Sequence, residues 1–166
     1  MKKLKNVDFP LAIAIMALLV IGCSRSLPFP KDCHTVKAKG IGQTVSQTAT
    51  GATTVATITG DPLIAGTTEA EFSNIPSLDP NEAPFKGKLK LFTMHGTLTL
   101  RVYNGKLSPL TGVFSSDGDV VHGTGKFENA TGRLFLSGLI NTNDGSFTED
   151  ITGIICLNKP VQHDWK

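Results

Sequence analysis

Beyond about residue 30, apolar and polar residues alternate in short runs, and glycines recur between and within these runs. Thr, Val, Ile, Leu and Phe dominate the alternating segments, whereas apolar residues at helical spacing are hard to find in this part of the sequence. Alternation with a period of two is typical of antiparallel strands that have one buried and one solvated face. The pattern therefore predicts an all-β domain.

The first half of this domain contains four stretches with strand-like alternation. They span residues 34–40, 53–60, 65–72 and 86–94. The segments that separate the first two and the last two, residues 40–52 and 74–84, are rich in glycine and proline, respectively, and are expected to form connections.

The second half contains dipeptides that favour tight hairpin turns. They are Asn104-Gly105, Asp117-Gly118 and Asp144-Gly145. Such pairs suit a type I′ turn, because both central residues adopt positive φ there. Residues 96 to 156 are therefore expected to form a meander of about five strands.

The expected strands and short turns leave two sheet edges that must be protected from pairing with other chains. Closure of the sheet removes both edges. The predicted fold is a closed antiparallel up-and-down β-barrel of about eight strands, with a two-sheet sandwich as the alternative.

The amino-terminal residues differ from the rest of the chain. Lys2, Lys3 and Lys5 precede an apolar run of about 14 residues, 9–22, and then a cysteine, which is the arrangement of a secretory signal. A transmembrane anchor is the weaker interpretation, because a spanning helix needs roughly 17 to 25 residues. Residues 1–22 are predicted to be a signal peptide.

Val20-Ile21-Gly22-Cys23 resembles the lipobox of bacterial lipoproteins. The resemblance implies that Cys23 becomes the lipid-carrying amino terminus, so that the protein contacts the membrane through this anchor in the cell envelope. Ser24 follows the cysteine, which in the Gram-negative sorting rule implies the outer membrane. The predicted organisation is a signal peptide (1–22), a tether (23–32) and a β-barrel domain (33–166).

Charge argues against nucleic-acid binding. The signal peptide accounts for the whole formal charge of +2, so the mature domain is about neutral. The only close set of basic residues, Lys86, Lys88 and Lys90, alternates with other residues and is better explained as a solvated strand face.

Two cysteines remain when Cys23 is assigned to the lipid. Cys33 lies at the start of the domain and Cys156 near its end. In an oxidising compartment such a pair suggests one disulfide, and this bond would join the first strand to the last if the sheet closes. A pair of unpaired or redox-active thiols is the alternative, although no CxxC spacing accompanies them.

The glycine-rich stretch at residues 120–138 is not a phosphate-binding loop. Val120 occupies the first glycine position of a Walker motif and Phe127 its hydroxyl position, and no helix pattern follows. Glycines within strands permit sharp bends or close approach of neighbouring chains, as barrel corners require. Gly123, Gly125 and Gly138 are expected to serve in this way.

Residues 123–132, GTGKFENATG, resemble the G-[TS]-G-x-F-x-x-A-x-G signature that plant allene oxide cyclases and dirigent proteins share. The resemblance is best from about Thr93 to Cys156. It implies an eight-stranded barrel, often trimeric, with an apolar cavity that in plants holds an unsaturated fatty-acid epoxide or a phenoxy radical pair. The family's catalytic residues lie on strands that cannot be aligned with this chain, so the catalytic residues here stay unknown.

Other candidate chemistry is sparse. The four histidines, His34, His95, His122 and His163, are scattered singly, so neither a metal site nor a cofactor is predicted. Glu69 and Glu71 share one strand face and are either an interior acid–base pair or, as favoured, part of a solvent face, because Ala70 and Phe72 take the opposite face.

One segment predicts the character of the interior. Leu98, Leu100 and Val102 share a strand face opposite Arg101 and Tyr103. If the leucine face lines a cavity, that cavity is apolar and suits a lipid or another hydrophobe.

Three functions fit these features. The favoured one is an envelope lipoprotein whose barrel binds a hydrophobic small molecule, because apolar strand faces and membrane placement are present and no catalytic constellation is found. A cyclase or isomerase acting on an unsaturated, lipid-like substrate and a structural or adhesive envelope module without ligand are the alternatives.

Overall fold

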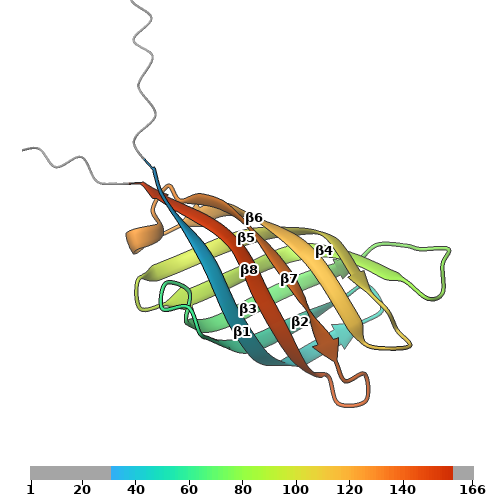
Figure 1. Cartoon of the computed structure of the whole chain (residues 1–166). Coiled ribbons are helices and arrows are strands. Elements are labelled where there is room, and N and C mark those ends of the chain that lie inside the picture. The colour runs from blue at the N-terminus through green and yellow to red at the C-terminus, as the bar shows by residue number, and fades with distance from the viewer. Residues whose placement is uncertain (1–30, 159–166) are drawn as a thin grey trace, which may run out of the picture.

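The computed structural model describes residues 31–158, which form a closed antiparallel barrel (Figure 1). Each strand pairs with the next in the chain, and the last returns to the first. The strands are β1 (Lys31–Thr48), β2 (Gly51–Thr59), β3 (Gly66–Asn74), β4 (Ala83–Thr93), β5 (Gly96–Leu107), β6 (Val113–Gly123), β7 (Thr131–Ile140) and β8 (Ser146–Asn158). The predicted closed barrel is confirmed.

The strands form because apolar residues recur at every second position and face the interior. On β3, for example, Thr68 and Ala70 are buried whereas Glu69 and Glu71 are exposed. The inward side chains of all eight strands make one core, and no helix among residues 31–158 is long and apolar enough to cross a membrane.

The seam between β1 and β8 closes the barrel. Cys33 lies directly opposite Cys156 in the register of this strand pair, and the two form a disulfide with their Cα atoms 3.9 Å apart. The predicted pairing is confirmed, because only closure of the sheet makes these two strands neighbours.

Two of the predicted hairpin turns are wrong. Asn104 and Gly105 lie within β5, where the pairing with β6 shifts register between Tyr103 and Lys106. The positive φ of Asn104, 51°, is used for a bulge that bends the strand and not for a turn.

Asp117 and Gly118 likewise lie within β6 and not in a turn. Gly118 is a buried, inward position, and the side chains of Leu100 and Leu136 lie where its own side chain would be. The segment from 96 to 156 consequently holds four strands and not five. The third prediction is confirmed: Gly145, with φ 74°, lies in the turn between β7 and β8.

The expected connection at residues 40–52 is wrong over most of its length. β1 continues through Gly40 and Gly42 to Thr48. Both glycines are paired within the sheet, and a side chain at Gly42 would collide with the ring of Phe147. They make room inside the barrel and do not end the strand.

The glycine-rich stretch forms a corner. β6 ends at Gly123, a short 3-10 helix, η1, covers Gly125–Phe127, and β7 then begins. Gly125 has φ 60°, and a Cβ on Gly138 would lie 2.0 Å from the carbonyl oxygen of Thr148. The expected bend and close approach are therefore confirmed.

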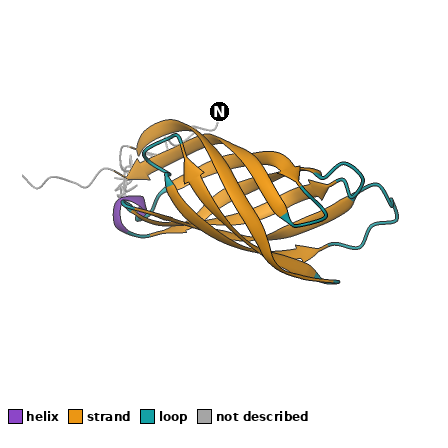
Figure 2. Cartoon of the chain, turned by 90° about the horizontal axis from the view of Figure 1, so that it is seen from below, coloured by secondary structure: helices purple, strands orange, loops and turns teal. Residues whose placement is uncertain are grey.

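The two ends of the barrel differ (Figure 2). At one end, called here the closed end, lie the start of β1, the end of β8 and η1, whose Phe127 is fully buried together with Ile64 from the β2–β3 connection. At the other end, called here the mouth, lie the connections 49–50, 75–82, 108–112 and 141–145.

Several predictions about the termini fall outside the described residues. They concern the signal peptide at 1–22, the lipobox Val20–Cys23 with the lipidation of Cys23, most of the tether at 23–32, and the end of the domain beyond Asn158. The structure shows that β1 already begins at Lys31, within the expected tether.

Candidate ligand-binding cavity

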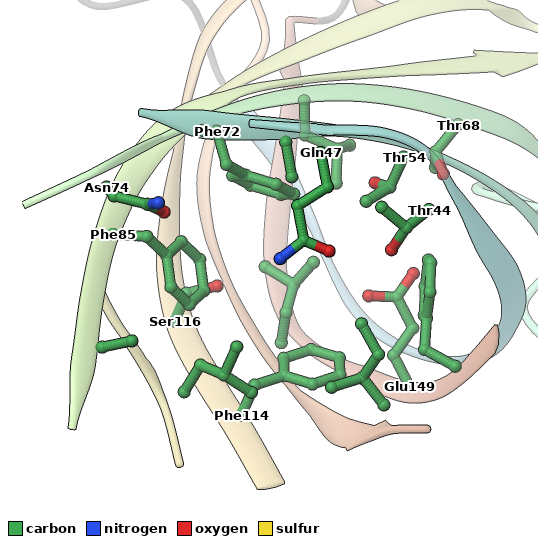
Figure 3. Close-up of a pocket in the computed structure, with 18 residues that line it drawn as sticks. Thr44, Gln47, Thr54, Thr68, Phe72, Asn74, Phe85, Phe114, Ser116 and Glu149 are labelled. Carbon is green, nitrogen blue, oxygen red and sulfur yellow. The ribbon is translucent and has the colours of Figure 1, made fainter. Parts of the chain in front are cut away.

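A cavity of about 140 Å³ occupies the half of the barrel nearest the mouth (Figure 3). All eight strands contribute to its wall, and exposed residues such as Gln47 and Asn74 at its rim connect it with solvent. Its lining comprises Thr44, Gln47, Gly51, Ala52, Thr54, Thr68, Phe72, Asn74, Ala83, Phe85, Leu89, Leu107, Phe114, Ser116, Leu136, Ile140, Phe147 and Glu149.

Four phenylalanine rings form much of the apolar wall. Phe72 of β3 and Phe85 of β4 meet edge to face with their ring centroids 5.2 Å apart. Phe114 of β6 and Phe147 of β8 make a similar pair at 6.2 Å. Edge-to-face packing is a preferred arrangement of aromatic rings, so these two pairs give the cavity a largely aromatic wall.

Three polar side chains of the lining lie close together on one side of the cavity. Figure 3 shows the hydroxyls of Thr44 and Thr54 and the carboxyl of Glu149 across the space from the rings of Phe72 and Phe85. Their strands, β1, β2 and β8, are consecutive around the closed sheet. These three polar groups therefore lie across the cavity from Phe72 and Phe85, whereas Ser116 and Asn74 lie near those two rings, and Phe147 lies on β8 with Glu149.

Three polar side chains of the cavity lining are deeply buried. Thr68 is 3%, Ser116 4% and Glu149 7% exposed. Within residues 31–158, none of their hydroxyl or carboxyl groups has a hydrogen bond to another side chain or to the backbone. Buried polar groups are usually hydrogen-bonded, so these groups are available to a molecule in the cavity.

Glu149 is the most unusual member of this set. It sits on the inward face of β8 between Phe147 and Ile151, and Gly40 on β1 leaves the space for it, because a Cβ there would lie 2.6 Å from the Glu149 Cγ. Burial raises the pKa of its carboxyl from an ordinary value of 4.5 to about 7. Near neutral pH this group can therefore either donate or accept a proton.

The outer wall offers a contrasting set of charges. On β5 to β7, Asp119 accepts hydrogen bonds from the Tyr103 hydroxyl (2.9 Å) and from Arg101 (3.2 Å), and these bonds lower the pKa of its carboxyl. Arg133 pairs with Asp117 at 3.0 Å and lies over the Tyr103 ring. Each of these charges has a partner on a neighbouring strand, so this cluster is explained as cross-strand pairing.

The carboxylate pair considered in the sequence lies outside the cavity. Glu69 and Glu71 are exposed on β3, opposite Lys90 and Lys88 of β4, respectively. The interpretation as a solvent face is confirmed, and these two residues take no part in the site.

The leucine face of β5 points inward as expected, but it does not line the cavity. Leu98, Leu100 and Val102 are at most 1% exposed and pack in the closed half of the barrel, while Arg101 is exposed. From β5 only Leu107, near the mouth, reaches the cavity wall.

Sequence reasoning missed Glu149, although a signal was present. In SFTEDITG the alternation places Phe147, Glu149 and Ile151 on one face, so a carboxylate occupies an otherwise apolar, inward face. A polar residue at such a position is the feature that identifies the candidate site.

Comparison with known proteins shows the fold. No protein-family model matches the chain, and no curated protein matches it. Among solved structures, the barrel is similar to the pterocarpan synthase dirigent protein PsPTS1, with 12% sequence identity, a TM-score of 0.51, and coverage of 80% of this chain and 100% of that one. It is also similar to the pterocarpan synthase dirigent protein GePTS1, with 11% identity, a TM-score of 0.52, and coverage of 81% and 90%.

The chain is a closed eight-stranded barrel, and these similarities show that its fold resembles that of dirigent proteins, which is related to that of allene oxide cyclase-like barrels. The fold predicted from the resemblance of residues 123–132 is therefore confirmed. At this level of identity, function depends on the site and not on the fold.

Proposed function

We propose that this protein binds a small hydrophobic molecule in the cavity behind the mouth. The observation that carries the proposal is the cavity of about 140 Å³, which has aromatic walls and buried polar groups without protein partners. A site of this kind, mostly apolar with a few polar groups, is typical of small-molecule binding.

The volume sets the size of the ligand. An apolar cavity of about 150 Å³ in another protein holds benzene. The part of the ligand inside this barrel therefore corresponds to about one aromatic ring or a short hydrocarbon chain, and anything larger extends through the mouth.

Calorimetric titration with benzyl alcohol, which has one ring and one hydroxyl, tests the proposal. For so small a ligand we expect a Kd on the order of 0.1 to 1 mM. The test variant is Thr54→Phe, which fills the cavity from β2, and the matched control is Val55→Phe, since Val55 is exposed on the other face of the same strand.

Thr54→Phe is expected to abolish binding, whereas Val55→Phe leaves it unchanged. Equal binding by both variants would place the ligand elsewhere on the protein. Absence of binding to the unmodified protein, together with no small molecule co-purifying by mass spectrometry, would contradict the proposal.

The sequence supports an envelope location for this binding protein. If Cys23 carries the lipid, the eight peptide steps to Lys31 span at most about 28 Å. Lys31 lies at the closed end, so the anchor would be attached at the end of the barrel opposite the mouth. Intact mass after membrane extraction tests the modification: a lipid-modified chain beginning at Cys23 is expected, and a full-length chain retaining Met1 would contradict it.

A catalytic role is the second candidate, and Glu149 is the observation that favours it. A buried carboxyl whose pKa is about 7 suits general acid–base chemistry on a bound, lipid-like molecule, as in a cyclase or isomerase. Conversion of a bound unsaturated epoxide to an isomer of the same mass, lost in Glu149→Gln but retained in Glu69→Gln, would support this role. Unchanged substrate after long incubation would contradict it.

A further inference from the structure

Glu149 is the only ionisable side chain among the described residues that line the cavity. Its partners in the register on β1 and β7 are Gly40 and Gly138, which have no side chains. The nearest charges along these strands, Lys39 and Asp150, lie 3.9 Å from each other and are largely exposed on the outer face. The carboxyl therefore faces the cavity without a counter-charge.

A buried carboxylate without a partner is unfavourable, and the protein can relieve this in two ways. Either the carboxyl keeps its proton, or a cation enters the cavity and pairs with it. No lysine, arginine or histidine among the described residues lines the cavity, so the cation would come from the ligand.

The surroundings of Glu149 match the head group of an amine. A protonated primary amine has three hydrogen-bond donors and no acceptor. The carboxyl of Glu149 provides acceptor oxygens, and the hydroxyls of Thr44 and Thr54 lie on the same side of the cavity (Figure 3). The rings of Phe72 and Phe85 opposite can hold an apolar body.

We propose that the cavity selects small hydrophobic molecules that carry a protonated amine and discriminates against those that carry a carboxylate. This inference rests on the proposed binding function and specifies its ligand class. A ligand carboxylate would meet the Glu149 carboxyl in an apolar enclosure, where like charges repel strongly and no basic side chain compensates.

Three one-ring probes of similar size test the inference: benzylamine, benzyl alcohol and benzoate. Their Kd values are measured by calorimetry at pH 6 and pH 8 and constant ionic strength, with the unmodified protein, Glu149→Gln and the control Glu69→Gln. The control removes an equivalent carboxylate from the outer face of β3.

At pH 8 we expect benzylamine to bind at least tenfold more tightly than benzoate. From pH 6 to pH 8 benzylamine stays protonated, whereas Glu149, with its pKa of about 7, loses its proton. The affinity of the protein for benzylamine should therefore rise up to about tenfold over this range. Glu149→Gln should weaken the binding of benzylamine at least tenfold and remove its rise with pH. The affinity of this variant for benzyl alcohol should change by less than about threefold. Glu69→Gln should behave as the unmodified protein does.

The outcomes separate the two proposals. The amine preference is wrong, and the binding function stands, if benzyl alcohol binds but benzoate binds as tightly as benzylamine. The same holds if Glu149→Gln leaves the Kd for benzylamine unchanged. If none of the three probes binds and no small molecule co-purifies, the binding function is wrong, and the amine preference is wrong with it. The pH dependence of the unmodified protein gives an independent measurement should Glu149→Gln fail to fold.

Discussion

The two halves of the barrel use the same eight strands in opposite ways. In the closed half, the inward positions carry large aliphatic side chains such as Leu91, Leu98 and Ile155, and Phe127 from η1 completes the packing; all four are at most 2% exposed. In the half behind the mouth, many inward positions carry small or hydroxyl-bearing residues, among them Ala52, Thr54 and Ser116. One half is filled and the other is hollow.

This difference shows that side-chain size at the inward positions helps to set the cavity. The same eight strands build both halves, and their pairing shifts register near the mouth, between Thr44 and Ser46, Phe85 and Gly87, and Tyr103 and Lys106. A few inward residues decide whether the interior becomes core or site, because an eight-stranded barrel is just wide enough for side chains to fill.

The largest expected effect comes from removing the residue that packs the closed end. Phe127→Ala should lower the free energy of unfolding by about 3–5 kcal/mol, because it creates a cavity where Phe127 is fully buried. Phe85→Ala, in the hollow half, should cost less than about 2 kcal/mol, since that ring is only partly buried beside existing space. Urea denaturation measures both. Equal losses would mean that the two halves are not packed differently.

The disulfide gives the next largest effect and concerns the closed end alone. Replacing both cysteines, Cys33→Ser with Cys156→Ser, should lower the free energy of unfolding by about 2–4 kcal/mol, since the bond closes a long loop in the unfolded chain. Urea denaturation in the absence of reductant measures this loss. Ligand binding at the mouth should persist in the folded variant. Loss of benzyl alcohol affinity in a folded sample would show that the two halves are coupled.

The filled half could be predicted from sequence better than the hollow half. Alternation of Leu98, Leu100 and Val102 identified an inward face, and two cysteines at the ends of the domain identified the closing seam. These features depend on local periodicity and on pairing between two residues, both of which a sequence shows directly.

The hollow half depends on residues that are close only after closure. Gly40 and Glu149 are far apart in the sequence, yet the glycine makes room for the carboxyl across the β1–β8 seam. The predicted hairpin turn at Asn104-Gly105 was wrong because positive φ occurs in hairpin turns and in bulges alike. Only the pairing of β5 with β6, which forms when the chain folds, distinguishes the two.

The titration of Glu149 makes the stability of the hollow half depend on pH. Its folded-state pKa, about 7, is raised above the ordinary 4.5, so the native state binds more protons than the unfolded state between these values. Stability should therefore be highest below about pH 4.5, as far as this group is concerned, and decline as pH rises to about 7.5, by on the order of 3 kcal/mol at most.

Glu149→Gln should remove this decline, and Glu69→Gln should not, because Glu69 is exposed on the outer wall. Urea denaturation at several pH values from 5 to 8 measures the slopes. If unmodified protein and Glu149→Gln lose stability in parallel, the carboxyl is not buried in a hollow interior as described.

The smallest expected effect concerns a single hydroxyl in the hollow half. Thr68 is 3% exposed and lines the cavity, and its hydroxyl makes no hydrogen bond to another residue in the described part of the chain. Replacing a hydroxyl that has no hydrogen bond to the protein with a methyl group of similar shape is neutral or favourable, so Thr68→Val should raise the free energy of unfolding by up to about 1 kcal/mol. The control is Thr67→Val, at the exposed neighbour on the outer face of β3, which should change stability by less than about 0.5 kcal/mol. Urea denaturation without added ligand measures both variants. A loss of more than about 1 kcal/mol in Thr68→Val would show that the hydroxyl is already used within the folded protein, and the polar side of the cavity would then have one group fewer to offer a ligand.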